Sequence, residues 1–146
     1  MTPADSIVNG YFYTFIYKAK DVRDVVDEVP LIYCIGPSTK NINNFVGLNL
    51  HHLSIPMRET LLRGMERTKS AITSGSRTIF SESELNSILP GCKIAIREYS
   101  RKRVYQCYKI DTKEIPLYIY GDGRKHVTVS DSEIQEAMRK IGILYK

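Results

Sequence analysis

The sequence predicts an α+β domain, built either as a small SH3-like β-barrel or as an antiparallel sheet, with flanking short helices and a C-terminal helix. Three observations predict this class. Short runs rich in β-branched and aromatic residues recur between turn-forming residues. Two Ser-x-x-Glu capping boxes precede stretches with apolar residues at helical spacing. The chain has 146 residues, 42% of them hydrophobic, which is enough to form a core without disulfides or metals.

The first part of the chain predicts three strands. Residues 11–17 carry aromatic rings on both alternating faces, which is typical of a strand covered on each side. Residues 31–35 are wholly apolar, and residues 45–50 follow an Asn-rich connection, so we expect these two strands to pair as an antiparallel hairpin. Between the first two strands, residues 21–28 have apolar positions at helical spacing and predict a short helix.

A longer helix is predicted over residues 56–68. Ser54 can cap it, and Pro56 is tolerated in a first turn. Its apolar stripe is Met57, Leu61, Leu62 and Met65. Residues 68–77 are small and polar and predict a flexible loop. We therefore interpret residues 1–146 as a single domain that this loop divides into two subdomains, 1–70 and 78–146.

The second part of the chain predicts a short helix, two hairpins and a final helix. A capping box at 81–84 begins the short helix, which ends at Pro90 and Gly91. Alternating apolar residues from 92 to 96 and the run 104–110 predict one hairpin. Residues 116–120 and 126–129 flank a Gly-Asp-Gly turn and predict another. The second capping box, 130–133, begins the C-terminal helix, which Gly142 is placed to end.

The residues that usually carry catalysis or metal binding show no pattern of either kind. Cys34, Cys92 and Cys107 lie in apolar or strand-like runs without metal-ligand spacing, which indicates buried free thiols in a reducing compartment. On a strand, adjacent His51 and His52 would point to opposite faces and not to one ion. We therefore expect a protein that is not an enzyme and has no metal or cofactor.

A basic, Tyr-rich segment is the strongest functional signal. The net charge is +5, and cations cluster with tyrosines where the first hairpin of the second part turns. Such a surface can hold phosphates while tyrosines stack on bases. The candidate nucleic-acid-binding residues are Arg97, Arg101, Lys102, Arg103, Tyr105 and Lys109. The alternative is a solvated sheet edge whose cations prevent strand pairing. Further cations, explained equally well by solubility, are Arg58, Arg63, Arg67, Lys69 and Arg77.

Residues 13–20, 29–32 and 44–53, with Arg58, resemble a family of small proteins encoded by large tailed bacteriophages. In that family an aromatic first strand, a Pro-Leu strand and a Gly-Leu-Asn-Leu-His-Tyr-Leu-Pro-like segment recur in this order. The resemblance covers roughly the first seventy residues. Here His52 stands where an aromatic residue is usual, and Pro56 comes later than the usual proline. The resemblance implies a viral origin and a place in the infected bacterial cytoplasm or the virion, without a mechanism.

The segment 47–53 also has a physical interpretation. Gly47 permits close strand approach, the leucines fill a core, and Asn49 or His51 can satisfy buried backbone groups. These are roles in folding and leave the function open.

Three functional hypotheses follow. The leading one is a bacteriophage virion structural or assembly component that contacts viral proteins or itself, with Tyr-rich strands as its interface. The alternative is a cytoplasmic protein that binds DNA or RNA phosphates through the basic hairpin. A third is a host-directed inhibitor, which needs only a shaped surface. We expect no membrane segment, because no stretch approaches eighteen uncharged apolar residues.

Overall fold

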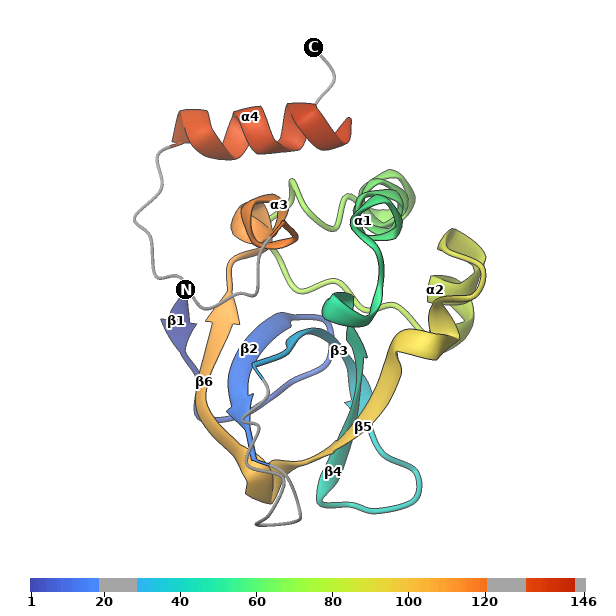
Figure 1. Cartoon of the computed structure of the whole chain (residues 1–146), viewed down its shortest axis with the longest axis vertical. Helices are drawn as coiled ribbons and strands as arrows, with labels where there is room; N and C mark the ends of the chain where they lie inside the picture. The colour runs from blue at the N-terminus through green and yellow to red at the C-terminus, as the bar shows by residue number, and fades with distance from the viewer. Residues whose placement is uncertain (19–28, 121–130, 144–146) are drawn as a thin grey trace.

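The computed structural model describes residues 1–18, 29–120 and 131–143. In these residues the strands form one six-stranded antiparallel sheet with helices gathered at one end (Figure 1). The strands are β1 (Thr2–Pro3), β2 (Phe12–Tyr17), β3 (Leu31–Pro37), β4 (Asn44–Asn49), β5 (Ile96–Ser100) and β6 (Val104–Ile110). The α-helices are α1 (Ile55–Lys69), α2 (Glu82–Ile88), α3 (Ile115–Tyr118) and α4 (Asp131–Ile141). The predicted α+β class is confirmed.

The sheet curls into an incomplete ring (Figure 1). Its strand order is β1-β6-β2-β3-β4-β5, and every neighbouring pair is antiparallel. No described register joins β5 to β6, so the structure has an open sheet, one of the two predicted alternatives. Residues 4–10 connect β1 to β2, and the backbone N–H of Ala4 donates to the Cys107 carbonyl at 2.9 Å.

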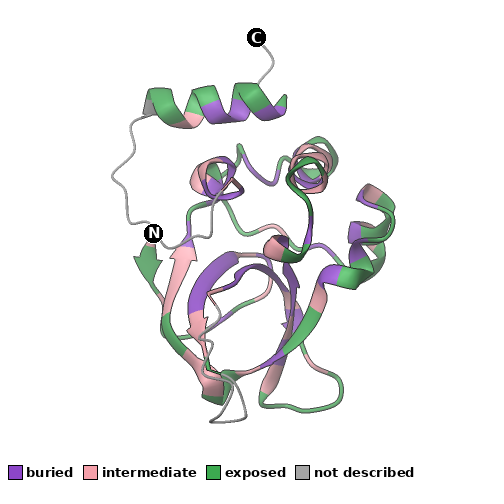
Figure 2. Ribbon diagram, in the orientation of Figure 1, coloured by how far each residue is buried: buried purple, intermediate pink, exposed green. Residues whose placement is uncertain are grey.

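The two faces of the sheet pack in two separate cores. Figure 2 shows the buried parts of the strands and helices in purple. On the inner face, the ring of Phe15 packs edge-on against Phe45 and Tyr99, with centroids 6.0 and 5.7 Å away. On the outer face, Phe12 and residues of β3 and β4 pack against the helices. The first four residues of β2 are buried, which confirms the predicted strand covered on both sides.

The segment around Gly47 has the predicted close packing. A Cβ on Gly47 would lie 2.9 Å from Cδ1 of Ile32 on β3, so only glycine fits without movement. Asn49 is fully buried; its side-chain oxygen accepts from the His51 N–H at 2.9 Å, and its amide donates to the Tyr99 hydroxyl at 3.1 Å. The chain then turns into a 3₁₀-helix, η1 (Leu50–His52), so β4 ends one residue before the predicted strand end.

The predicted helix signals are confirmed at α1, at α2 and at the end of α4. The Ser54 hydroxyl caps α1 by accepting from the Met57 N–H. Ser81 and Glu84 form the reciprocal capping box of α2. Gly142 follows α4 with a φ of 88°, the left-handed conformation that glycine adopts at helix ends. No helix in the described parts of the chain is long and apolar enough to cross a membrane.

The segment predicted as a flexible loop, residues 68–77, is anchored at its start. Ala71 and Ile72 are buried. The Glu66 carboxylate accepts hydrogen bonds from the Ile72 and Thr73 N–H groups, each at 2.9 Å, and from the Thr73 hydroxyl at 2.6 Å. Strands from both predicted subdomains belong to the one sheet, and one core contains residues of both.

The hairpin predicted from residues 92–110 is wrong. β5 pairs with β4, and β6 pairs with β2 and β1. Residues 92–95 form a 3₁₀-helix, η2 (Cys92–Ala95), instead of the first half of a strand. In this helix, residues three apart share a face, so Cys92 and Ala95 are both buried. Ile94 lies on another face and is 64% exposed, whereas an alternating strand would have placed it on the same face as Cys92.

The strand predicted over residues 116–120 is also wrong, since residues 115–118 form α3. Pro116 occupies the first turn, where its missing N–H costs nothing. Ile115 and Ile119, four residues apart, are both fully buried, which satisfies the same apolar residues in a helical arrangement. The predicted helix 21–28, strand 126–129, turn 121–123 and Ser130 cap lie outside the described residues.

Candidate nucleic-acid interface

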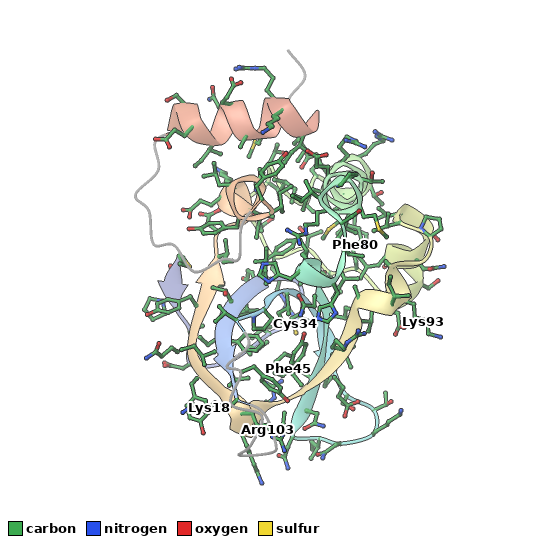
Figure 3. All side chains as sticks on the ribbon, viewed as in Figure 1. Lys18, Cys34, Phe45, Phe80, Lys93 and Arg103 are labelled. Carbon is green, nitrogen blue, oxygen red and sulfur yellow. The ribbon has the colours of Figure 1, made fainter. Side chains whose placement is uncertain are left out.

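Two distant parts of the chain meet where β5 turns into β6. The turn is a 3₁₀-helix, η3 (Arg101–Arg103), and Lys18 lies beside it directly after β2 (Figure 3). The Lys18 N–H donates to the Arg103 carbonyl at 3.1 Å. We call Lys18, Lys102, Arg103 and Tyr105 the basic corner. The sequence pattern missed Lys18, because only the pairing of β2 with β6 brings it there.

Two of the three cations of the basic corner have no internal side-chain partner among the described residues. Lys102 is exposed and Arg103 is half-buried. Within the described residues, neither side chain makes an ion pair or a hydrogen bond. The Lys18 ammonium lies over the Tyr105 ring, 4.7 Å from its centroid. Cations without an internal partner are free to neutralise phosphates.

A β-bulge in β6 determines which way Tyr105 faces. The register with β2 shifts between Thr14 and Ile16, and Gln106 has a φ of 48°. In a regular strand Tyr105 and Cys107 would share one face. Here Cys107 packs in the inner core, whereas Tyr105 lies opposite Ile16 on the outer face and is 46% exposed.

Arg101 belongs to the predicted set but is used inside the protein. Its guanidinium donates to the Ile7 carbonyl at 3.2 Å and lies 5.3 Å from the Phe45 ring centroid. It therefore ties the connection between β1 and β2 to η3.

Arg97 and Lys109 are not brought to the corner. Arg97, on β5, lies opposite Gly47 of β4. Its guanidinium donates to the Ile94 and Ile96 carbonyls at 2.6 and 3.0 Å. The Lys109 ammonium lies 4.4 Å from the Tyr11 ring centroid. At about 3.3 Å per strand residue, both are roughly 10 Å or more along their strands from the corner.

Most cations of α1 and of the segment after it make contacts within the protein. Arg63 donates to the Ile141 carbonyl at 3.1 Å, and Lys69 pairs with Glu84 at 2.8 Å. Arg58 and Arg77 donate to backbone carbonyls as well. Arg67 is exposed and lines an open groove of about 380 Å³ between α1 and α2.

No family model, curated protein or solved structure matches this chain. Function is therefore inferred from the contacts of the chain itself.

The thiols lie in packing environments. Burial raises the pKa of the Cys34 thiol to about 11 and that of Cys107 to about 12, and it also raises the pKa of Cys92. A thiol must lose its proton to act as a nucleophile or metal ligand. These thiols therefore stay protonated near neutral pH. No cluster of three potential metal ligands occurs among the described residues.

Three of the strand tyrosines that the virion hypothesis would use as an interface lie in the interior. Tyr13, Tyr33 and Tyr99 are each no more than 3% exposed. The Tyr33 hydroxyl donates to the Thr78 carbonyl at 2.6 Å and accepts from the Phe80 N–H at 2.8 Å. These rings therefore hold the sheet together, and Tyr105 differs from them in being exposed.

Proposed function

We propose that this protein acts through contacts with a macromolecule and binds nucleic acid through the basic corner. The observation that carries this proposal is the convergence of Lys18 with Lys102 and Arg103, the last two without internal partners in the described structure. Contacts of this kind fix a protein on a phosphate backbone without requiring a particular sequence. The net charge of +5 favours association with a polyanion over the whole surface.

The viral setting implied by the sequence resemblance remains part of this proposal. Nucleic acid is present both in the infected bacterial cytoplasm and in the virion, so the proposed ligand fits either place.

A role in virion structure through protein contacts is the second candidate, and one observation favours it. Ile42, in the loop between β3 and β4, is 88% exposed. This loop lies beside η3, since the Arg101 N–H donates to the Asn43 carbonyl at 3.2 Å. An apolar side chain this exposed is a natural anchor for a protein partner. We rank it second because it is a single side chain among polar neighbours.

The proposal predicts a salt-sensitive loss of binding on Lys102→Ala/Arg103→Ala. Each lost phosphate contact reduces the slope of log affinity against log salt by about 0.7 for a single strand and about 0.9 for a duplex. The double variant should therefore lower the slope by roughly 1.4 to 1.8 and weaken binding on the order of tenfold at moderate salt. Fluorescence anisotropy with labelled oligonucleotides measures both quantities.

The matched control is Arg67→Ala/Lys93→Ala. It removes one arginine and one lysine, both exposed, and Lys93 lies well away from Arg103 (Figure 3). It should leave the slope close to that of the unmodified protein. Equal losses in the two double variants would show attraction to net charge alone and overturn the corner as the site. Absence of binding by the unmodified protein would overturn the nucleic-acid proposal and favour a search for protein partners in purified virions.

A further inference from the structure

We infer that the basic corner receives unpaired nucleotides, with Tyr105 as the surface on which one base stacks. This inference rests on the proposed function, because the cations of the corner supply the phosphate contacts that hold the strand. It goes beyond that function by selecting single-stranded over double-stranded nucleic acid.

The position of Tyr105 suits this role. Its ring is 46% exposed on the outer face of β6, where Ile16 lies opposite it. Arg103 precedes it by two residues, and the Lys18 ammonium is 4.7 Å from the ring centroid. A base on this ring would have its own phosphates within reach of these cations, which is the arrangement of aromatic platform and basic groove that binds single strands.

The backbone holds this arrangement at a cost. Gln106 is one of only two non-glycine residues with positive φ in the described chain, and a side chain in that region is disfavoured. The bulge it forms is what separates the exposed Tyr105 from the half-buried Cys107. Strained residues of this kind cluster at functional sites. The Lys18 ammonium lies over one face of the ring and restricts its motion, so a base stacks on the other face or replaces the ammonium.

An exposed ring on a sheet distinguishes the two forms of nucleic acid. In a duplex the base faces are stacked on one another and closed to a tyrosine, so only the cations contribute. In a single strand the base faces are open, and one stacked base strengthens binding by roughly 5- to 100-fold. The corner should therefore prefer a single strand, although its cations alone, which release more counterions from a duplex, would favour the duplex.

The test compares one labelled oligonucleotide, as a single strand and as a duplex, by fluorescence anisotropy. The unmodified protein should bind the single strand more tightly. Tyr105→Ala should weaken single-strand binding by roughly 5- to 100-fold while leaving duplex binding and the salt slope unchanged. Tyr105→Phe, which keeps the ring, should retain the preference. Equal binding of both forms, or a Tyr105→Ala variant that binds the single strand normally, would overturn the inference.

A spectroscopic variant tests stacking directly. The chain contains no Trp, so Tyr105→Trp carries a single indole whose emission is quenched when a base stacks on it. Ile94→Trp is the control, because Ile94 is 64% exposed and lies on η2, away from the corner. Quenching of the first variant alone by a saturating single strand is expected. Unchanged emission of Tyr105→Trp at saturation contradicts stacking.

The two proposals fail in different ways. If the unmodified protein binds neither form, the nucleic-acid function itself is wrong. If it binds both equally and depends on Lys102 and Arg103 but not on Tyr105, the function stands and the single-strand inference is wrong.

Discussion

Single residues of this protein are constrained for different reasons even when their type is the same. Gly47 and Gly36 both lie in the sheet. A Cβ on Gly47 would meet Cδ1 of Ile32 at 2.9 Å, whereas a Cβ on Gly36 would meet nothing within 4 Å. The first glycine is therefore required by close packing between β3 and β4, and the second is not.

This contrast gives a stability prediction. Gly47→Ala should lower the free energy of unfolding by about 1–3 kcal/mol, the usual cost of overpacking, while Gly36→Ala should cost much less. Because valine lacks Cδ1, Gly47→Ala should cost less in an Ile32→Val background than in the unmodified protein. Urea denaturation of the four variants measures the coupling. Equal stability of the two glycine variants would contradict the packing explanation.

At the scale of elements, one ion pair connects the end of α1 to the start of α2. Lys69 contacts Glu84 at 2.8 Å and also lies over the ring of Phe80, at 4.7 Å from its centroid. Glu84 accepts from the Ser81 N–H at 2.9 Å. The hydrogen bond from Lys69, and then that from the Ser81 backbone, lower the pKa of Glu84 to about 2. The same carboxylate therefore caps one helix and holds the other.

The lowered pKa predicts how stability depends on pH. A carboxyl group whose pKa is lower in the folded state stabilises the protein above its unfolded pKa, and this stabilisation is lost as pH falls through the folded value. Glu84 should therefore contribute fully above about pH 4.5 and lose its contribution between there and about pH 2.

Glu84→Gln tests this prediction, because glutamine can still accept from the Ser81 N–H but carries no charge for Lys69. The variant should melt below the unmodified protein at neutral pH, and the gap should close as pH approaches 2. A gap in melting temperature that stays constant with pH would exclude the ion pair as its source.

Elements with local signals could be predicted from the sequence. Ser54 and Ser81 begin helices because their hydroxyls accept from N–H groups three residues ahead, a contact that sequence spacing reveals. Strand pairing has no such signal. β5 and β6 look like a hairpin locally, but their partners β4 and β2 come from the first half of the chain. The segment around Pro116 predicts a strand wrongly, because its Ile, Leu and Tyr residues suit a strand or a buried helix equally.

The whole molecule depends on how the open side of the sheet is held. β5 and β6 are joined by η3, but the two strands do not pair with each other. The Tyr17 hydroxyl accepts from the Ser100 N–H at 2.9 Å and joins β2 to β5 across the opening. Arg101 ties η3 to the connection between β1 and β2 through the Ile7 carbonyl. Side chains therefore do at this opening what a backbone ladder does elsewhere in the sheet.

Loss of Arg101 should loosen this opening. Arg101→Ala removes a charged hydrogen bond and a cation–π contact, and we expect a loss of about 1 kcal/mol in the free energy of unfolding. Amide hydrogens of residues 4–10 should exchange faster with solvent, as mass spectrometry of peptides would detect. Lys102→Ala is the control, because the Lys102 side chain makes no ion pair, hydrogen bond or cation–π contact among the described residues. Unchanged exchange in residues 4–10 would show that Arg101 does not hold them.

The candidate site was predictable only in part, because some of its residues are brought together by long-range contacts. The run from Arg101 to Arg103 and the nearby Tyr105 stand together in the sequence. Lys18 joins them through the β2–β6 register, and the guanidinium of Arg101, although the residue is exposed, is engaged by the Ile7 carbonyl. Neither of these two contacts can be predicted from the local sequence pattern. Long-range contacts thus add one cation to the site and engage another in a hydrogen bond within the protein.

The place of β6 between β1 and β2 has a consequence for synthesis on the ribosome. When residues 1–95 have emerged from the ribosome, β2, β3 and β4 can already pair, but β5 and β6, which flank them on the two sides, have not yet emerged. The nascent three-stranded sheet therefore has two unpaired edges, each of which can pair with a strand of another polypeptide. Polypeptides that stop before residue 104 should accordingly be prone to aggregate, whatever the stability of the finished protein.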